Sequence, residues 1–245
     1  MESLAENMTK DRLENLIKTQ LYNISDIITY LTIWEELHIA FQTGEKYREV
    51  YQWSPFFWQT LLHNYQQRFL IETAKLYDKS TDSMGIQKMI NICEQNQKLF
   101  PKEHTRKLFE IRDDREIIQT VSVNISGILQ SAKSKYLEMS ESGQKLRQLR
   151  DKHLAHADHK YYTDITSLYE EVGLGREEFR NMIDTAGEIM NSFLTALTDT
   201  RIALKHLDVD DYKHLLGFAY EGITAYEQET NGRKSQSIDV SEKLN

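Results

Sequence analysis

Cysteine, proline and glycine are scarce in this chain of 245 residues, which has one cysteine, two prolines and ten glycines. The single cysteine, Cys93, excludes an intramolecular disulfide and a zinc site built on several cysteines. It lies among Ile90, Ile92 and Leu99, which favours a small buried thiol over a reactive one. Prolines and glycines mark the frequent turns of sandwiches and barrels, so their scarcity favours long helices.

Long apolar runs are also missing. No segment approaches the roughly 20 consecutive apolar residues of a membrane span. The start of the chain, with acidic residues, differs from the basic and then apolar start of a signal peptide. We therefore expect a cytoplasmic protein with no membrane partner. The sequence also has no glycine-rich phosphate loop, no dinucleotide fingerprint and no Ser-His-Asp arrangement on a strand, which excludes ATPase, dehydrogenase and hydrolase folds.

Negative charge predominates, with a formal net charge of −8, which argues against a protein that coats nucleic acid nonspecifically. Residues 98–160 differ, because they carry 13 lysines and arginines against 9 aspartates and glutamates, a net charge of +4. A local basic surface of this kind can hold a phosphate backbone at one place. The same counts also fit an ordinary solvated helix surface.

Apolar residues recur every three or four positions over much of the chain, which predicts amphipathic helices and an all-α fold. The predicted helices are 13–37, ended by Gly44; 55–76, with Ser54 as N-cap and Pro55 in the first turn; 83–99, capped by Ser83; 101–139, with a possible break at 112–115; a helix after a turn at 140–143; 176–204; and 210–228. This predicts an antiparallel bundle of about seven helices, in one domain over residues 1–228. Residues 229–245 are polar and aperiodic, which predicts a disordered tail.

Arginine and histidine gather in residues 145–162, where His153, His156 and His159 fall within seven positions. Histidine can take and give a proton near neutral pH. Arginine holds a phosphate through paired hydrogen bonds and keeps its charge. Without a cluster of carboxylates, this combination suits phosphoryl transfer that needs no metal ion.

Helix geometry gives these residues different places. At about 100° per residue, Leu146, Leu149 and His153 share one face, with Arg150 and His156 on either side of it, about 120° apart. If this face packs against a helix or a second subunit, Arg150 and His156 flank the contact. A packed, hydrogen-bonded role is then favoured for His153 over that of a second base.

Two short strings carry a family resemblance. Residues 150–158 read Arg-Asp-Lys-His-Leu-Ala-His-Ala-Asp, and residues 74–78 read Ala-Lys-Leu-Tyr-Asp. The first resembles the Arg-polar-(four to six residues)-His motif of the HEPN superfamily, and both resemble the HEPN-like domain of abortive-infection proteins of the AbiU type. The likeness covers about residues 10–205. Spacing alone also allows the pairs Arg147/His153 and Arg201/His206, but only Arg150/His156 has an aspartate directly after the arginine and the trailing Ala-His-Ala-Asp context.

The resemblance implies a helical bundle that dimerises, and many members are metal-independent endoribonucleases. By that analogy, His156 takes the proton of an RNA 2′-hydroxyl and Arg150 holds the scissile phosphate. The products would be a 2′,3′-cyclic phosphate and a 5′-hydroxyl. Asp151 is expected to orient Arg150 or His156, and Asp158 a neighbouring histidine.

The basic neighbours of the motif, Arg147, Lys152 and Lys160, are candidate RNA contacts, and we expect neither a cofactor nor a metal. The expected partners are RNA, a second copy of the chain, and an antitoxin or second component of phage defence. HEPN toxins paired with a nucleotidyltransferase often carry a tyrosine two residues after the motif histidine. Asp158 occupies that position here, so control by nucleotidylation is not expected.

Three alternatives stay open. The chain can be a catalytically silent HEPN-like module that binds RNA or a protein. The three clustered histidines can be metal ligands, although the segment lacks the usual carboxylate or cysteine partners. The aromatic cluster at residues 53–58 can stack RNA bases, although core or dimer packing is favoured.

Overall fold

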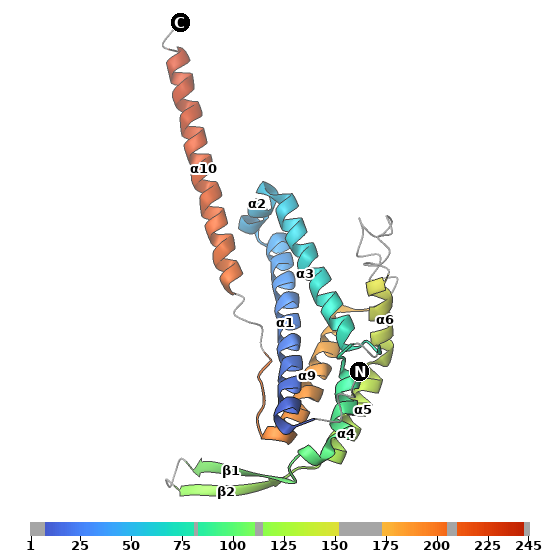
Figure 1. Cartoon of the computed structure of the whole chain (residues 1–245). Coiled ribbons are helices and arrows are strands. Elements are labelled where there is room, and N and C mark those ends of the chain that lie inside the picture. Colours follow the sequence, from blue (N-terminus) through green and yellow to red (C-terminus); the bar gives the residue numbers. More distant parts are fainter. Residues whose placement is uncertain (1–7, 81–82, 111–114, 152–172, 205–209, 243–245) are drawn as a thin grey trace. The chain divides into compact units, whose positions relative to one another are not determined.

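The computed structural model describes residues 8–80, 83–110, 115–151, 173–204 and 210–242, with the backbone alone for residues 45, 106–110, 115–118, 210 and 231–242 (Figure 1). The elements are α1 (Lys10–Thr43), α2 (Glu45–Trp53), α3 (Pro55–Leu76), α4 (Ile86–Gln95), the 3-10 helix η1 (Gln97–Leu99), β1 (Glu103–Glu110), β2 (Arg115–Ser122), α5 (Ile125–Glu138), α6 (Ser140–Arg150), α9 (Arg176–Thr198) and α10 (Asp210–Glu242). The mostly helical fold is confirmed. Across this described part, no helix is both long enough and apolar enough to cross a bilayer.

The chain divides into two compact units, Met1–Ile28 with Phe69–Lys205 and Thr29–Arg68 with His206–Asn245. Helix α10 continues through residues 229–242, which the sequence assigns to a polar tail. The predicted limits of the domain, residues 1–228, stay a prediction.

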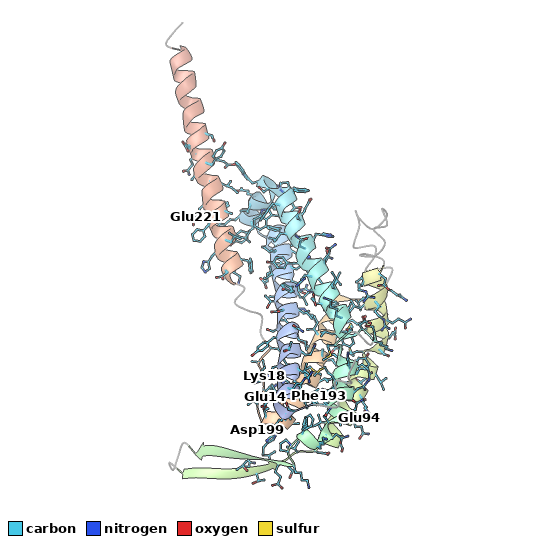
Figure 2. All side chains as sticks on the ribbon, viewed as in Figure 1. Glu14, Lys18, Glu94, Phe193, Asp199 and Glu221 are labelled. Atoms are coloured by element: carbon cyan, nitrogen blue, oxygen red, sulfur yellow. The ribbon has the colours of Figure 1, made fainter. Side chains whose placement is uncertain are left out.

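The core of the first unit is built from the apolar faces of α1, α4 and α9. Leu13, Ile17 and Ile24 of α1 are fully buried, at helical spacing, and Phe193 of α9 is fully buried as well (Figure 2). Helix α9 approaches α1 at Gly187, where an added Cβ would lie 3.8 Å from Ile24 Cγ2. Beside this apolar stripe, α1 carries a Glu14–Lys18 ion pair of 2.7 Å (Figure 2).

The helix predicted over residues 101–139 is wrong at residues 103–110 and 115–122, which form two antiparallel strands. Strand β1 pairs with β2 from Glu103 opposite Ser122 to Glu110 opposite Arg115. The β2 sequence, Arg-Glu-Ile-Ile-Gln-Thr-Val-Ser, is rich in β-branched residues, which favour strands over helices. The helix resumes at α5, where the Asn124 side chain accepts a hydrogen bond from Gly127 N at 3.0 Å, as an N-cap does.

Other helix ends also differ from the predictions. The N-cap of α4 is Gly85 rather than Ser83, and α6 already begins at Ser140, inside the predicted turn. Helix α9 ends at Thr198, before the predicted end at 204, because Asp199 has a left-handed backbone with φ of 59°. The polar run after Gly44 contains helix α2, which the sequence analysis missed.

The second unit has its own small core of Leu37, Phe41, Val50, Trp58 and Leu216. The Trp58 indole donates a 3.1 Å hydrogen bond to Val50 O. Core packing is therefore confirmed for this member of the aromatic cluster at residues 53–58. The other three aromatic side chains of the cluster are exposed.

Candidate functional site

Tyr77, in the string Ala-Lys-Leu-Tyr-Asp, fastens the end of α3 to three other helices. Its hydroxyl donates a 2.6 Å hydrogen bond to Met182 O of α9, and its ring stacks on Tyr136 of α5 at 6.0 Å. On α6, Gly143 lies against Tyr77, because an added Cβ would be at van der Waals distance, 3.4 Å, from Tyr77 Cβ. Tyr77 is only 2% exposed, and burial raises the pKa of its hydroxyl, with a smaller contribution from Tyr136. The hydroxyl therefore stays protonated and acts as a donor.

Asp78 follows directly and carries the negative charge at this end of α3. Its two carboxylate oxygens accept hydrogen bonds from Ser80, one from the backbone N at 3.0 Å and one from Oγ at 3.2 Å. Further along the chain, Gly85 packs against the end of α3. A Cβ added there would lie 2.8 Å from Leu76 O and 2.9 Å from Asp78 O, which is too close for any residue but glycine. This close approach holds the backbone of Asp78 in place.

Arg150 at the end of α6 faces this carboxylate. Arg150 Nη1 lies 4.0 Å from Asp78 Oδ2, and the two side chains are 29% and 27% exposed. Arg150 Nε also donates a 2.9 Å hydrogen bond to Asp151 Oδ1, and Nη2 lies 2.8 Å from the same oxygen. The last residue of one string, Asp78, and the first residue of the other, Arg150, therefore meet at one partly exposed place.

Arg147 lies one turn before Arg150 and is half-buried. Its Nη1 donates to Tyr77 O at 3.5 Å, a long hydrogen bond. Burial raises the pKa of Tyr136, the charge of Arg147 lowers it, and that of Asp78 raises it, with a net rise. Arg147 and Asp78 therefore have opposite effects on the pKa of the same hydroxyl, that of Tyr136. The predicted RNA contact of Arg147 stays a prediction.

The other predicted site residues lie outside the described part of the chain. They are His156, the predicted base; His153 and Asp158, predicted to support it; and Lys152 and Lys160, predicted RNA contacts. Their roles stay predictions, as do those of Arg150 and Asp151. His159, the third candidate metal ligand, also lies outside. In the residues that the structure describes, no group of three or more His, Cys, Asp or Glu side chains could hold a metal ion.

A family model described as AbiU2, of the HEPN class, matches residues 6–218. The chain belongs to the AbiU2 family of HEPN domains. The matched range of this AbiU2 domain contains Tyr77, Asp78 and Arg150, together with His156. No curated protein and no solved structure matches the chain.

Two features of the AbiU2 site escaped the sequence analysis. The sequence gives Asp78 no role beyond its place in the family string, because its partner Arg150 is distant in sequence. Beside Asp78 lies a cavity of about 370 Å³ that also receives Gln20 of α1. The sequence contains one indication of this cavity, because Gln20 is a polar residue on the buried stripe of α1, between Ile17 and Ile24.

Proposed function

We propose that this AbiU2 domain is a metal-independent endoribonuclease of phage defence, with Arg150 and His156 as its working pair. The observation that carries the proposal is the meeting of Arg150 with Asp78. The guanidinium is partly exposed and its five N–H groups outnumber its contacts with Asp151 and Asp78, which leaves donors available to a phosphate. An arginine that served the core alone would be expected to be buried.

In this reaction, His156 takes the proton of an RNA 2′-hydroxyl, whose oxygen attacks the adjacent phosphorus. The P–O5′ bond then breaks, and the 5′-oxygen takes a proton from the imidazolium or from water. The products are a 2′,3′-cyclic phosphate and a 5′-hydroxyl. Arg150 holds the non-bridging oxygens and stabilises the charge that grows on them in the transition state. Asp151 keeps the guanidinium in its orientation.

The family description, AbiU2, supports a role in abortive infection. Such a role requires that the activity be restrained in uninfected cells. We propose RNA as the substrate, a homodimer as the working form, and an antitoxin or second defence component as the restraint.

A second candidate is a catalytically silent module that binds RNA or a protein through the same surface. The charges around Arg150 favour it, because Asp78 and Asp151 balance Arg147 and Arg150. The described part of the site therefore has no excess positive charge, and such a surface attracts a phosphate backbone weakly.

RNA cleavage in EDTA distinguishes the two candidates. The purified protein is incubated with total RNA and with defined single strands, beside Arg150→Ala and His156→Ala. Arg12→Ala and His214→Ala are the matched controls, because both residues are exposed on other helices. If the protein is a nuclease, the wild type and both controls should produce cyclic phosphate ends, and Arg150→Ala and His156→Ala should not. RNA binding without cleavage by the folded wild type would support the silent module.

A further inference from the structure

The cavity beside Asp78 has a volume of about 370 Å³, within the size range of small-molecule pockets. Its walls come from α1, from the end of α3 and from the residues before α4. Asp78 both lines this cavity and lies 4.0 Å from Arg150. Asp78 is therefore a common neighbour of the cavity and of the arginine that we assign to the phosphate.

Gln20 is the unusual residue of this cavity. Eight polar or charged side chains are buried in the described part of the chain, and Gln20 is 7% exposed. The other seven have hydrogen bonds or other polar contacts, such as Asn191 with Ile202 O at 3.0 Å. No bond of this kind joins the Gln20 carboxamide to any residue that the structure describes. Burying an amide without a hydrogen-bond partner lowers the stability of the fold. An amide of this kind that lines a cavity therefore indicates that a ligand supplies the missing partner.

The walls favour a flat, uncharged polar ligand over an ion. Both carboxylates are engaged, because Glu72 pairs with Lys75 at 3.0 Å and Asp78 accepts two hydrogen bonds from Ser80. The remaining polar groups include the carboxamides of Gln20 and Asn23, which lie one turn apart on α1.

The apolar part of the wall consists of Ile27, Leu76 and Met84. Aliphatic side chains and a methionine sulfur make favourable contacts with an aromatic face. A carboxamide offers a donor and an acceptor side by side, as the edge of a base requires.

We propose that this cavity binds one nucleobase of the RNA substrate, next to the phosphate held by Arg150, and that the Gln20 carboxamide pairs with the edge of that base. A carboxamide pairs with adenine through two hydrogen bonds, to N6 and N7. Adenine is therefore the expected base. This inference rests on the proposed function, because it assigns a specificity pocket to the same RNA site.

Binding of the four nucleoside 3′-monophosphates, which offer no phosphodiester bond to cleave, tests the pocket directly. Calorimetry compares the wild type with Gln20→Leu, and with Gln130→Leu, the same substitution at an exposed position of α5. We expect the wild type and Gln130→Leu to prefer adenosine 3′-monophosphate over the uridine compound by about tenfold. Gln20→Leu loses that preference and unfolds at a higher temperature, because an unpaired buried amide has been removed. If Gln20→Leu does not fold, Asn23→Ala, at an exposed position, must weaken the preference instead.

Equal binding of all four nucleotides by the wild type, or an unchanged preference in folded Gln20→Leu, overturns the inference. The outcomes separate this inference from the nuclease proposal. Base preference through Gln20 without RNA cleavage in EDTA refutes the nuclease and retains the pocket. RNA cleavage with equal binding of the four nucleotides refutes the pocket and retains the nuclease.

Discussion

Replacing Arg150 by alanine tests whether this arginine serves chemistry or the fold. Its contacts in the described part of the chain are with the adjacent Asp151, which is 59% exposed, and with Asp78 at 4.0 Å. Exposed ion pairs contribute about 0.2–1 kcal/mol. The side chain is itself 29% exposed, so the packing lost with its stem is small. We therefore expect Arg150→Ala to lower the free energy of unfolding by about 1 kcal/mol.

Leu149 provides the internal standard, because it precedes Arg150 on α6 and is fully buried. Leu149→Ala should cost about 2–5 kcal/mol. Urea denaturation followed by circular dichroism measures both variants, beside RNA cleavage in EDTA. The reasoning predicts that Arg150→Ala loses cleavage while it stays folded. A stability loss of Arg150→Ala as large as that of Leu149→Ala, with cleavage retained, would refute it and make Arg150 a structural residue.

Three further predictions concern stability and reactivity. Tyr77→Phe should cost about 1 kcal/mol in thermal or urea unfolding, because it removes the hydrogen bond to Met182 O. Burial raises the pKa of the Cys93 thiol to about 12, so at pH 8 a thiol reagent should modify this cysteine only as the protein unfolds. Burial raises the pKa of Glu178, but the Ser142 hydrogen bond and the Lys145 charge outweigh it and lower the pKa overall. Glu178 should therefore stabilise the fold above the usual carboxyl pKa, and this contribution should disappear as the pH falls through the lowered value.

Each of these has a contrasting outcome. Tyr77→Phe with the stability of the wild type would mean that the hydroxyl contributes nothing. Thiol modification faster than unfolding would contradict the buried position of Cys93. For Glu178→Gln, the stability difference from the wild type should shrink on acidification, and a constant difference from pH 7 to pH 3 would contradict the lowered pKa.

The helical part of this fold could be predicted well, because the spacing of apolar residues and the positions of proline and glycine are local properties of the sequence. Leu13, Ile17 and Ile24 are all buried, as their spacing in α1 requires. The failure at β1 and β2 has a physical reason. A strand is stabilised by its neighbour across the hairpin, as at Glu103 opposite Ser122, and short charged strands resemble helix surfaces in sequence.

The sequence by itself determined the helical class, the family strings and the gathering of arginine and histidine near Arg150. The tertiary structure decided which of these residues meet. Tyr77 makes hydrogen bonds with Met182, 105 positions away in the sequence, and with Arg147, 70 positions away. The period of a helix carries no information about contacts at such separations. That Gln20 has no hydrogen-bond partner among the described residues is likewise a property of the packed chain, because a polar residue on an apolar stripe finds or lacks a partner only when the other helices surround it.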